Sequence, residues 1–219
     1  MVHEKINKVR SLFKYKIFVK TILERMALKG IKIQPYYLVL EQLHQDIDPF
    51  FDSGYEEYTC GYLAHEDMEE VSNCRNWGHP AEFYIDRMKS GQKCFGVKYK
   101  GSLAAFVWID VKKCNFKGAK FKLKNNEAYF YDQWTVEKYR GKKIASFIRL
   151  QCYRTLNQEG RKVFFSISEV FNKPAIKFKQ RLGAKNIKIG IYIELFNKYS
   201  WPLKSIPLPE KWAATSYRA

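Results

Sequence analysis

The chain has 219 residues, of which 46% are hydrophobic and 16% aromatic, and this composition excludes an intrinsically disordered protein. Its 39 lysines and arginines against 22 aspartates and glutamates give a formal net charge of +17, so we expect an anionic partner such as nucleic acid, an anionic membrane or a phosphorylated small molecule. Five scattered cysteines without a CxxC pair and four isolated histidines argue against a disulfide framework and a metal site. No apolar run approaches the ~18 residues of a membrane span, and lysines interrupt any signal-peptide pattern, so we expect a cytoplasmic protein.

Residues 1–50 are expected to form a basic N-terminal extension. Basic and apolar residues are interleaved over residues 1–30 at a spacing that predicts one or two amphipathic helices ending near Gly30. Such a helix could make peripheral contact with an anionic membrane, or pack on its own domain with its lysines in water. Residues 34–43 predict a strand or a short buried segment, and residues 46–54 a connecting loop.

The main domain is expected over residues 51–199, followed by a C-terminal tail over 200–219. Period-two patterns, helical patterns and turn residues predict its elements in chain order: a strand at 56–64, helices at 65–76 and 81–89, a hairpin of strands at 93–100 and 103–113, a lysine-rich loop at 114–126, a strand at 127–136, a helix at 144–160, a strand at 162–168, a helix at 172–183 and a strand at 187–196. This order predicts a mixed α/β sheet.

A basic turn precedes the helix that begins at Ile144. Arg140, Gly141, Lys142 and Lys143 follow the strand directly, where the first N–H groups of the helix lack partners and can bind an anion. The helix dipole and the cations would reinforce this site, and Gly141 removes a side chain where a phosphate would approach the backbone. The alternative is an ordinary charged helix cap that faces solvent.

Residues 56–196 resemble the GCN5-related N-acetyltransferase (GNAT) family. In that family a turn of pattern [Q/R]-x-x-G-x-[G/A] cradles the pyrophosphate of acetyl-CoA. The corresponding residues are Arg140, Gly141, Lys142, Lys143, Ile144 and Ala145, with Lys143 in place of the usual glycine.

A second family signature reads N-x-x-A-[I/L]-x-[F/L]-Y-x-x-x-G-F. Five residues of this chain match it in register: Asn172, Ala175, Ile176, Phe178 and Gly183. Lys179 replaces the tyrosine that many members use as general acid, and Ala184 replaces the closing phenylalanine.

The resemblance implies an α+β fold with a mostly antiparallel sheet flanked by helices. Its fourth and fifth strands, here 127–136 and 162–168, would splay apart as a V that holds the thioester of acetyl-CoA or another acyl-CoA. The backbone of Trp134, Thr135 and Val136 would pair with pantetheine, because an amide chain can satisfy a free strand edge. The basic turn, Asn172 and Phe178 complete the expected cofactor-binding residues.

Three residues are candidates for proton transfer. An attacking amine must be unprotonated, so a base is needed, and strand alternation places Asp132 on one face with Trp134 and Val136. Glu169 is the second candidate base; for both carboxylates the alternative is hydration or pairing with a lysine. Lys179 could donate a proton to the departing thiolate or offset its charge, or it could simply point into solvent.

The resulting prediction is an acyl-CoA-dependent N-acyltransferase that moves an acetyl group to a primary amine by direct attack in a ternary complex. The charge balance suits a small anionic acceptor such as a nucleotide-linked amino sugar. One alternative is a membrane-associated transferase of longer acyl chains. Another is a GNAT-like module that binds CoA or nucleic acid without catalysis, which the departures at Lys143 and Lys179 favour, although no nucleic-acid motif is present and nucleic acid is not expected.

Overall fold

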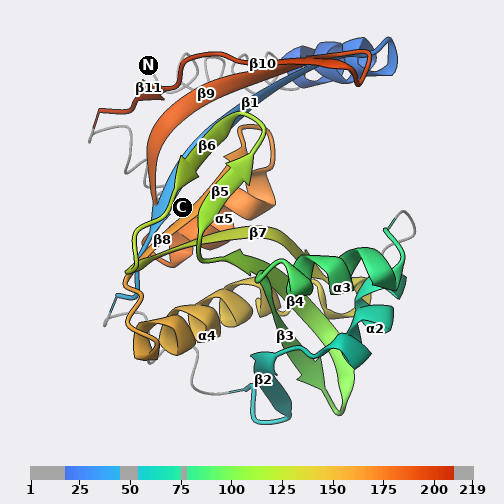
Figure 1. Cartoon of the computed structure of the whole chain (residues 1–219), viewed down its shortest axis with the longest axis vertical. Coiled ribbons are helices and arrows are strands. Elements are labelled where there is room, and N and C mark those ends of the chain that lie inside the picture. The colour runs from blue at the N-terminus through green and yellow to red at the C-terminus, as the bar shows by residue number, and fades with distance from the viewer. Residues whose placement is uncertain (1–17, 45–53, 75–77, 210–219) are drawn as a thin grey trace, which may run out of the picture.

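The computed structural model describes residues 18–44, 54–74 and 78–209 (Figure 1). The predictions for residues 1–17 and 45–53 lie outside these ranges. Residues 18–28 are helical and exposed on most sides, and the apolar side chains of Phe18 and Leu28 are 61% and 89% accessible. None of the helices in the described ranges has both the length and the apolar character needed to cross a membrane.

One mixed sheet organises the structure, with strand order β10-β9-β1-β8-β7-β4-β3-β2. Among the described residues, neighbouring strands of this sheet pair antiparallel, except that β7 pairs parallel with β8. The strands are β1 (Ile31–Glu41), β2 (Tyr58–Tyr62), β3 (Lys93–Tyr99), β4 (Ser102–Asp110), β7 (Glu127–Thr135), β8 (Val163–Glu169), β9 (Lys185–Leu195) and β10 (Tyr199–Pro202), with β11 (Ile206–Pro207) also paired to β9.

The helices that follow β1 in the chain cover the two faces of this sheet. They are α2 (Met68–Asn73), α3 (Ala81–Lys89), α4 (Ile144–Gln158) and α5 (Lys173–Arg181), with short 3₁₀ segments η2 (His65–Asp67) and η3 (Glu137–Tyr139). Alternate residues of β4 enter two cores, because successive side chains of a strand point to opposite faces. Val107 and Ile109 pack with α4, whereas Phe106 and Trp108 pack with α2 and α3. The predicted α/β class with a mostly antiparallel sheet is therefore confirmed, while the V-shaped splay stays a prediction.

The segment predicted as a lysine-rich loop instead forms a hairpin, β5 (Lys113–Phe116) and β6 (Ala119–Lys122). Its lysines alternate with apolar residues, and the apolar side packs on the sheet: the Phe121 ring lies edge-on to Phe165 of β8, and Tyr36 of β1 donates to the Gly118 carbonyl at 2.5 Å. The prediction was wrong because the number of lysines hid a period-two pattern.

Strands also form at both ends of the predicted main domain. β1, which the sequence assigned to the extension, lies inside the sheet between β8 and β9, with register partners from Tyr36–Glu169 to Glu41–Phe164 on the β8 side. β10 crosses the predicted boundary between the main domain and the tail, and it pairs with β9 from Tyr199–Leu195 to Pro202–Tyr192. β1 is therefore part of the same sheet as the strands of the main domain, although it lies on the other side of the boundary expected near residue 50.

Candidate active site

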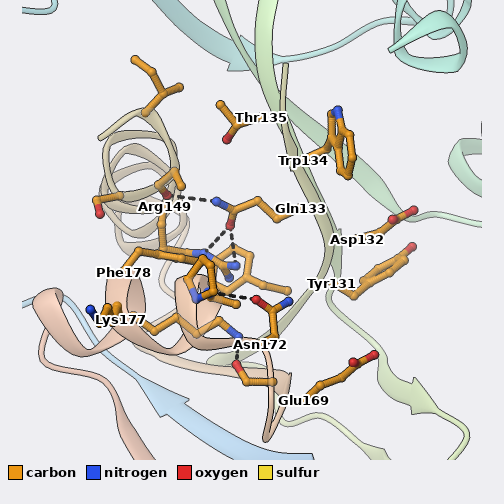
Figure 2. A pocket seen from close by; sticks show the side chains of 18 of the residues that line it. Tyr131, Asp132, Gln133, Trp134, Thr135, Arg149, Glu169, Asn172, Lys177 and Phe178 are labelled. Carbon is orange, nitrogen blue, oxygen red and sulfur yellow. Dashed lines mark hydrogen bonds between the residues drawn. The ribbon is translucent and has the colours of Figure 1, made fainter. Parts of the chain in front are cut away.

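A cavity of about 1100 Å³ lies where β7 and β8 stop pairing. Register partners run from Glu127–Val163 to Phe130–Ser166, and both strands continue beyond this point. Residues 131–135 of β7 and 167–169 of β8 line the cavity together with the first turns of α4 and α5. Figure 2 shows that Gln133 points toward α4 and α5, whereas Tyr131 and Asp132 point to the other side of β7.

The basic turn has an unusual backbone conformation. Gly141 and Lys143 have φ of 81° and 58°, so both lie in the left-handed region, and α4 begins immediately afterwards at Ile144. The usual family residue at the position of Lys143 is glycine, and a left-handed φ explains that preference. Lysine can adopt this conformation at a cost of about 1–2 kcal/mol.

Aromatic packing holds this turn in place. Tyr55 stacks on Phe147 of α4, with ring centroids 4.0 Å apart and planes inclined by 7°. Its hydroxyl donates to the Lys142 carbonyl at 3.2 Å. The turn is thus anchored by a residue that lies more than eighty positions earlier in the chain.

The residues of the turn suit a bound diphosphate. A Cβ added at Gly141 would meet no atom within 4 Å, so the backbone is open to a ligand there. The Ile144 and Ala145 amides begin α4 and have no carbonyl one turn back within the helix, whereas the Ser146 and Phe147 amides donate to the Lys143 carbonyl at 3.0 and 3.1 Å. Arg140, Lys142 and Lys143 are exposed around these first amides. The diphosphate of an acyl-CoA would therefore meet backbone donors and full positive charges at this mouth of the cavity.

The backbone groups expected to pair with pantetheine are partly used within the protein. The Val136 amide donates to the Ala104 carbonyl at 2.9 Å, so it is not available as predicted. Residue pairs along two antiparallel strands alternate between hydrogen-bonded and non-hydrogen-bonded. Thr135 precedes Val136 and lies opposite Ala105 in a non-hydrogen-bonded pair, so its N–H and C=O point away from β4 toward the cavity. Its carbonyl accepts from Arg140 Nε at 3.2 Å, and the Arg140 guanidinium lies 4.9 Å from the centre of the Trp134 ring.

A β-bulge determines where Asp132 points. The register of β4 with β7 shifts between Phe106 and Trp108, and Asp132 has φ of 51°. Its carboxylate pairs with Arg87 of α3 at 2.8 Å, and both side chains are only 21% accessible. The predicted common face with Trp134 is retained (Figure 2), and the carboxylate is paired with an arginine.

Glu169, the second candidate base, lies at the end of β8 and is exposed. Its carboxylate accepts from Gln34 Nε2 of β1 at 2.5 Å. Figure 2 places it on the same side of the strands as Asp132. The structure thus brings both candidate bases to one side of the cavity.

Lys179 does not point into solvent, contrary to one of the two alternatives. Its side chain is buried, and its amino group donates to Ser166 Oγ at 2.6 Å, Ser168 Oγ at 2.8 Å and the Ile167 carbonyl at 3.1 Å. Burial lowers the pKa of Lys179 to about 7, with Glu41 opposing and Arg149 adding to this effect. Lys179 can therefore lose or gain a proton near neutral pH.

Lys179 belongs to a buried cluster of Glu41, Arg149, Tyr153, Ser166 and Lys179 that joins β1, α4, β8 and α5. The Glu41 carboxylate accepts from Tyr153 and Ser166 and lies 3.6 Å from Arg149 Nη1 and 4.0 Å from Lys179 Nζ. Burial acts to raise the pKa of Glu41, but the two cations and the two hydroxyl donors outweigh it and leave the pKa below its usual value. Glu41 is thus an anion inside the protein.

Arg149 links this cluster to the cavity wall. Its Nε and Nη2 donate to Gln133 Oε1 at 3.0 and 2.6 Å, and Gln133 Nε2 donates to the Ala145 carbonyl at 2.9 Å (Figure 2). The guanidinium also lies 4.2 Å from the centre of the Phe130 ring. The first turn of α4 is therefore fixed to β7.

Sequence reasoning missed Glu41, Gln133, Arg149 and Ser168. A single carboxylate in the apolar run LVLEQL and a single arginine in SFIRL were the available signals, since charged residues rarely lie in buried stripes unless they are paired. The predicted cap of α5 is confirmed, because Asn172 Oδ1 accepts from the Ala175 amide at 3.2 Å. Phe178 packs at the edge of the main core.

Comparison with known proteins places these features in a family. A family model described as the acetyltransferase (GNAT) family matches residues 43–184, which is more than half of the chain. No curated protein sequence matches the chain.

Several solved structures share the fold. One is a functionally unknown conserved protein from Staphylococcus epidermidis, with a TM-score of 0.57 and 11% identity over 80% of this chain and 66% of that chain. Another is a GNAT-family acetyltransferase from Colwellia psychrerythraea, with a TM-score of 0.52 and 15% identity over 75% of this chain and 57% of that chain. A tandem GNAT protein from the clavulanic acid biosynthesis pathway has a TM-score of 0.50 and 15% identity over 77% of this chain and 51% of that chain.

This chain spans 57% to 66% of the length of the first structures that it matches. At these identities the structures support the fold, and the family rests on the matched model. That model covers both motifs, and the two motifs border one cavity between β7 and β8. The chain therefore belongs to the GNAT family of acetyltransferases.

Proposed function

We propose that the protein transfers an acetyl group from acetyl-CoA to the primary amine of a small acceptor by direct attack within a ternary complex. The observation that carries this proposal is the left-handed turn at Gly141–Lys143 at the start of α4, opening on the cavity between β7 and β8. Acetyl-CoA would supply the activated acyl group. The residues of this chain bind the donor, orient the amine and move protons.

Donor binding is assigned to the α4 and α5 side of the cavity. Positive side chains line that side: Arg140, Lys143, Lys173, Lys177 and Arg181. The amides at the start of α4 and the Arg140 and Lys142 side chains would hold the diphosphate, and the Thr135 backbone, which faces the cavity, would meet the pantetheine arm. An anionic donor is thus favoured on this side.

Acceptor binding is assigned to the opposite side, where the charge has the other sign. Asp132 and Glu169 line it with Gln34, Phe116 and Tyr131, and Arg87 offsets only one of the two carboxylates. A small amine that is cationic in solution fits this environment better than an anionic acceptor. The anionic acceptor was inferred from the charge of the whole chain, most of which is unrelated to this side of the cavity.

Two proton transfers are needed. We assign to Asp132 the role of accepting a proton from the attacking amine, and its ion pair with Arg87 would fix its orientation. Lys179 is the source of the proton that the departing thiolate needs, because it lines the cavity and can give up a proton near neutral pH. These roles make Lys179 the functional replacement of the family's tyrosine.

Thiol release from acetyl-CoA across a panel of cationic, neutral and anionic primary amines tests the donor, the reaction and the acceptor class together. We expect release with cationic amines and a rise in Tm with acetyl-CoA at about millimolar concentration. Asp132→Asn is expected to lower kcat by about 100-fold. Turnover with anionic amines alone would overturn the acceptor assignment, and the absence of a Tm shift would overturn the donor assignment.

A further inference from the structure

Lys179 has no N–H left to aim into the cavity. A lysine ammonium has three N–H groups, and here they are directed at Ser166 Oγ, Ser168 Oγ and the Ile167 carbonyl. Direct donation to a ligand in the cavity would require one of these hydrogen bonds to break. One of the three acceptors must therefore carry the proton onward, or the lysine must move.

The two serines differ in what their own protons do. The Ser166 hydroxyl donates to Glu41 Oε1 and so points into the buried cluster. Within the described residues the only hydrogen bond of the Ser168 side chain is the one that it accepts from Lys179. Ser168 is only 3% exposed but lines the cavity, whereas Ser166 is not one of the residues that line the cavity. The Ser168 hydroxyl proton is thus available to a group in the cavity.

The charged groups around Lys179 explain how this lysine can give up a proton and later regain it. The groups that face it are Glu41 from β1, Arg149 and Tyr153 from α4, and the two uncharged serines of β8. Burial and the Glu41 carboxylate raise the pKa of Tyr153 well above its usual value, so this residue stays a neutral donor to Glu41. Glu41 and Arg149 neutralise each other, and the cluster is neutral when Lys179 has lost its proton. The loss of that proton therefore leaves no unbalanced charge in the interior.

We propose that Ser168 is the catalytic residue that protonates the departing thiolate and that Lys179 re-protonates Ser168, with Glu41 as a positioning residue for Lys179. This inference rests on the proposed function. As the carbon–sulfur bond of the donor breaks, the Ser168 O–H bond breaks and an S–H bond forms. At the same time an N–H bond of Lys179 breaks and the serine O–H bond is restored, which leaves a neutral lysine that recovers its proton from water.

The test compares serine variants that remove the same kind of bond to Lys179. Ser168→Ala is expected to lower kcat by about 10- to 100-fold, and Ser168→Thr, which keeps a hydroxyl, to restore it to within about threefold of the wild type. Ser166→Ala is expected to lower kcat less than Ser168→Ala. Equal losses in the two alanine variants, or no rescue by threonine, would overturn the relay and leave a structural role.

A second measurement uses the ligand-free protein and does not depend on turnover. The Lys179 titration is followed by NMR of ¹³Cε-labelled lysine, with Lys179→Met to assign the signal. In Glu41→Gln the midpoint is expected about 1 pH unit below that of the wild type, because the carboxylate that favours the ammonium is gone. In Ser168→Ala the Lys179 midpoint is expected to stay within about half a pH unit of the wild-type value. A loss of kcat in this variant would then not result from an altered pKa of Lys179.

The outcomes separate the two proposals. A wild-type protein that releases no thiol with any amine overturns the proposed function and the relay with it. A wild type that turns over, loses kcat in Lys179→Met and keeps kcat in Ser168→Ala overturns the relay alone. An unchanged Lys179 midpoint in Glu41→Gln overturns the role of Glu41.

Discussion

Two groups of cations lie at or beside the same cavity, one exposed to solvent and one buried. Arg140, Lys142 and Lys143 form the exposed turn before α4, whereas Arg149 and Lys179 lie in the buried cluster with accessibilities of 2% and 5%. The exposed cations come from four consecutive positions. The buried cations lie thirty residues apart in the chain, and both lie close to the carboxylate of Glu41 of β1.

This difference shows how the surroundings of a positive charge decide its chemistry. In water a lysine stays charged, and its field attracts an anionic ligand over a distance that salt reduces. In the interior the same side chain loses hydration, so its proton becomes exchangeable near neutral pH. The turn is therefore suited to binding and the cluster to proton transfer.

The strongest test of this division is replacement of the buried lysine. Lys179→Met is expected to lower kcat by about 100-fold, because it removes the proton source. Lys179→Arg should be similarly impaired, since a guanidinium keeps the charge but does not release its proton near neutral pH. In both variants the KM for acetyl-CoA should stay close to that of the wild type. Steady-state kinetics provide the measurement, and full kcat in Lys179→Arg would reduce Lys179 to an electrostatic role.

The environment of Lys179 also predicts how stability depends on pH. The folded state loses the Lys179 proton near pH 7 whereas the unfolded chain keeps it to about pH 10.4, so the unfolded state binds more protons in between. The free energy of unfolding of the wild type should rise relative to Lys179→Met by up to about 1.4 kcal/mol per pH unit above pH 7. Urea unfolding of both proteins at pH 7, 8 and 9 measures the difference. A difference that stays flat over this range would contradict the burial of an exchangeable lysine.

The exposed turn is tested with two glycines in matched conformations. Gly141 and Gly160 have φ of 81° and 83°, and an added Cβ would meet nothing within 4 Å at either position. Aspartate at either site should lower the free energy of unfolding by about 1 kcal/mol, because a residue with a Cβ is strained in the left-handed conformation. Only Gly141→Asp should raise the KM for acetyl-CoA, by about 10-fold, because it places a carboxylate beside the diphosphate. Equal KM values for Gly141→Asp and Gly160→Asp would place the diphosphate elsewhere.

The smallest expected effect concerns Lys143, which occupies the position where the family turn usually has glycine. Lys143→Gly relieves a left-handed φ of 58° and should raise the free energy of unfolding by up to about 1 kcal/mol, since glycine removes the strain but adds entropy to the unfolded chain. Lys142→Gly removes the same charge without that relief and should destabilise the protein. The KM for acetyl-CoA should change by less than about threefold in Lys143→Gly, because the backbone amide is retained. Thermal unfolding and kinetics of the two variants distinguish strain from charge.

Local patterns in the sequence were sufficient to predict most of the helices and strands of the fold. The order of strands and helices from 56 to 196, the cap of α5 at Asn172 and the basic turn before Ile144 each depend on residues close together in the chain, because periodicity, capping and turn conformation are local properties. The β5–β6 hairpin was also readable in principle, since its lysines alternate with buried Cys114 and half-buried Phe121.

Tertiary structure alone decided the chemistry of the site. The placement of β1 between β8 and β9 brings Glu41 to Lys179, and no local pattern encodes a contact across about 140 residues. The same holds for the ion pair of Arg87 with Asp132, which depends on a bulge in β7. The sequence by itself determined the family and the basic turn before α4, whereas the proton affinity of Lys179 and Glu41 was set by burial and by partners that only the folded sheet brings together.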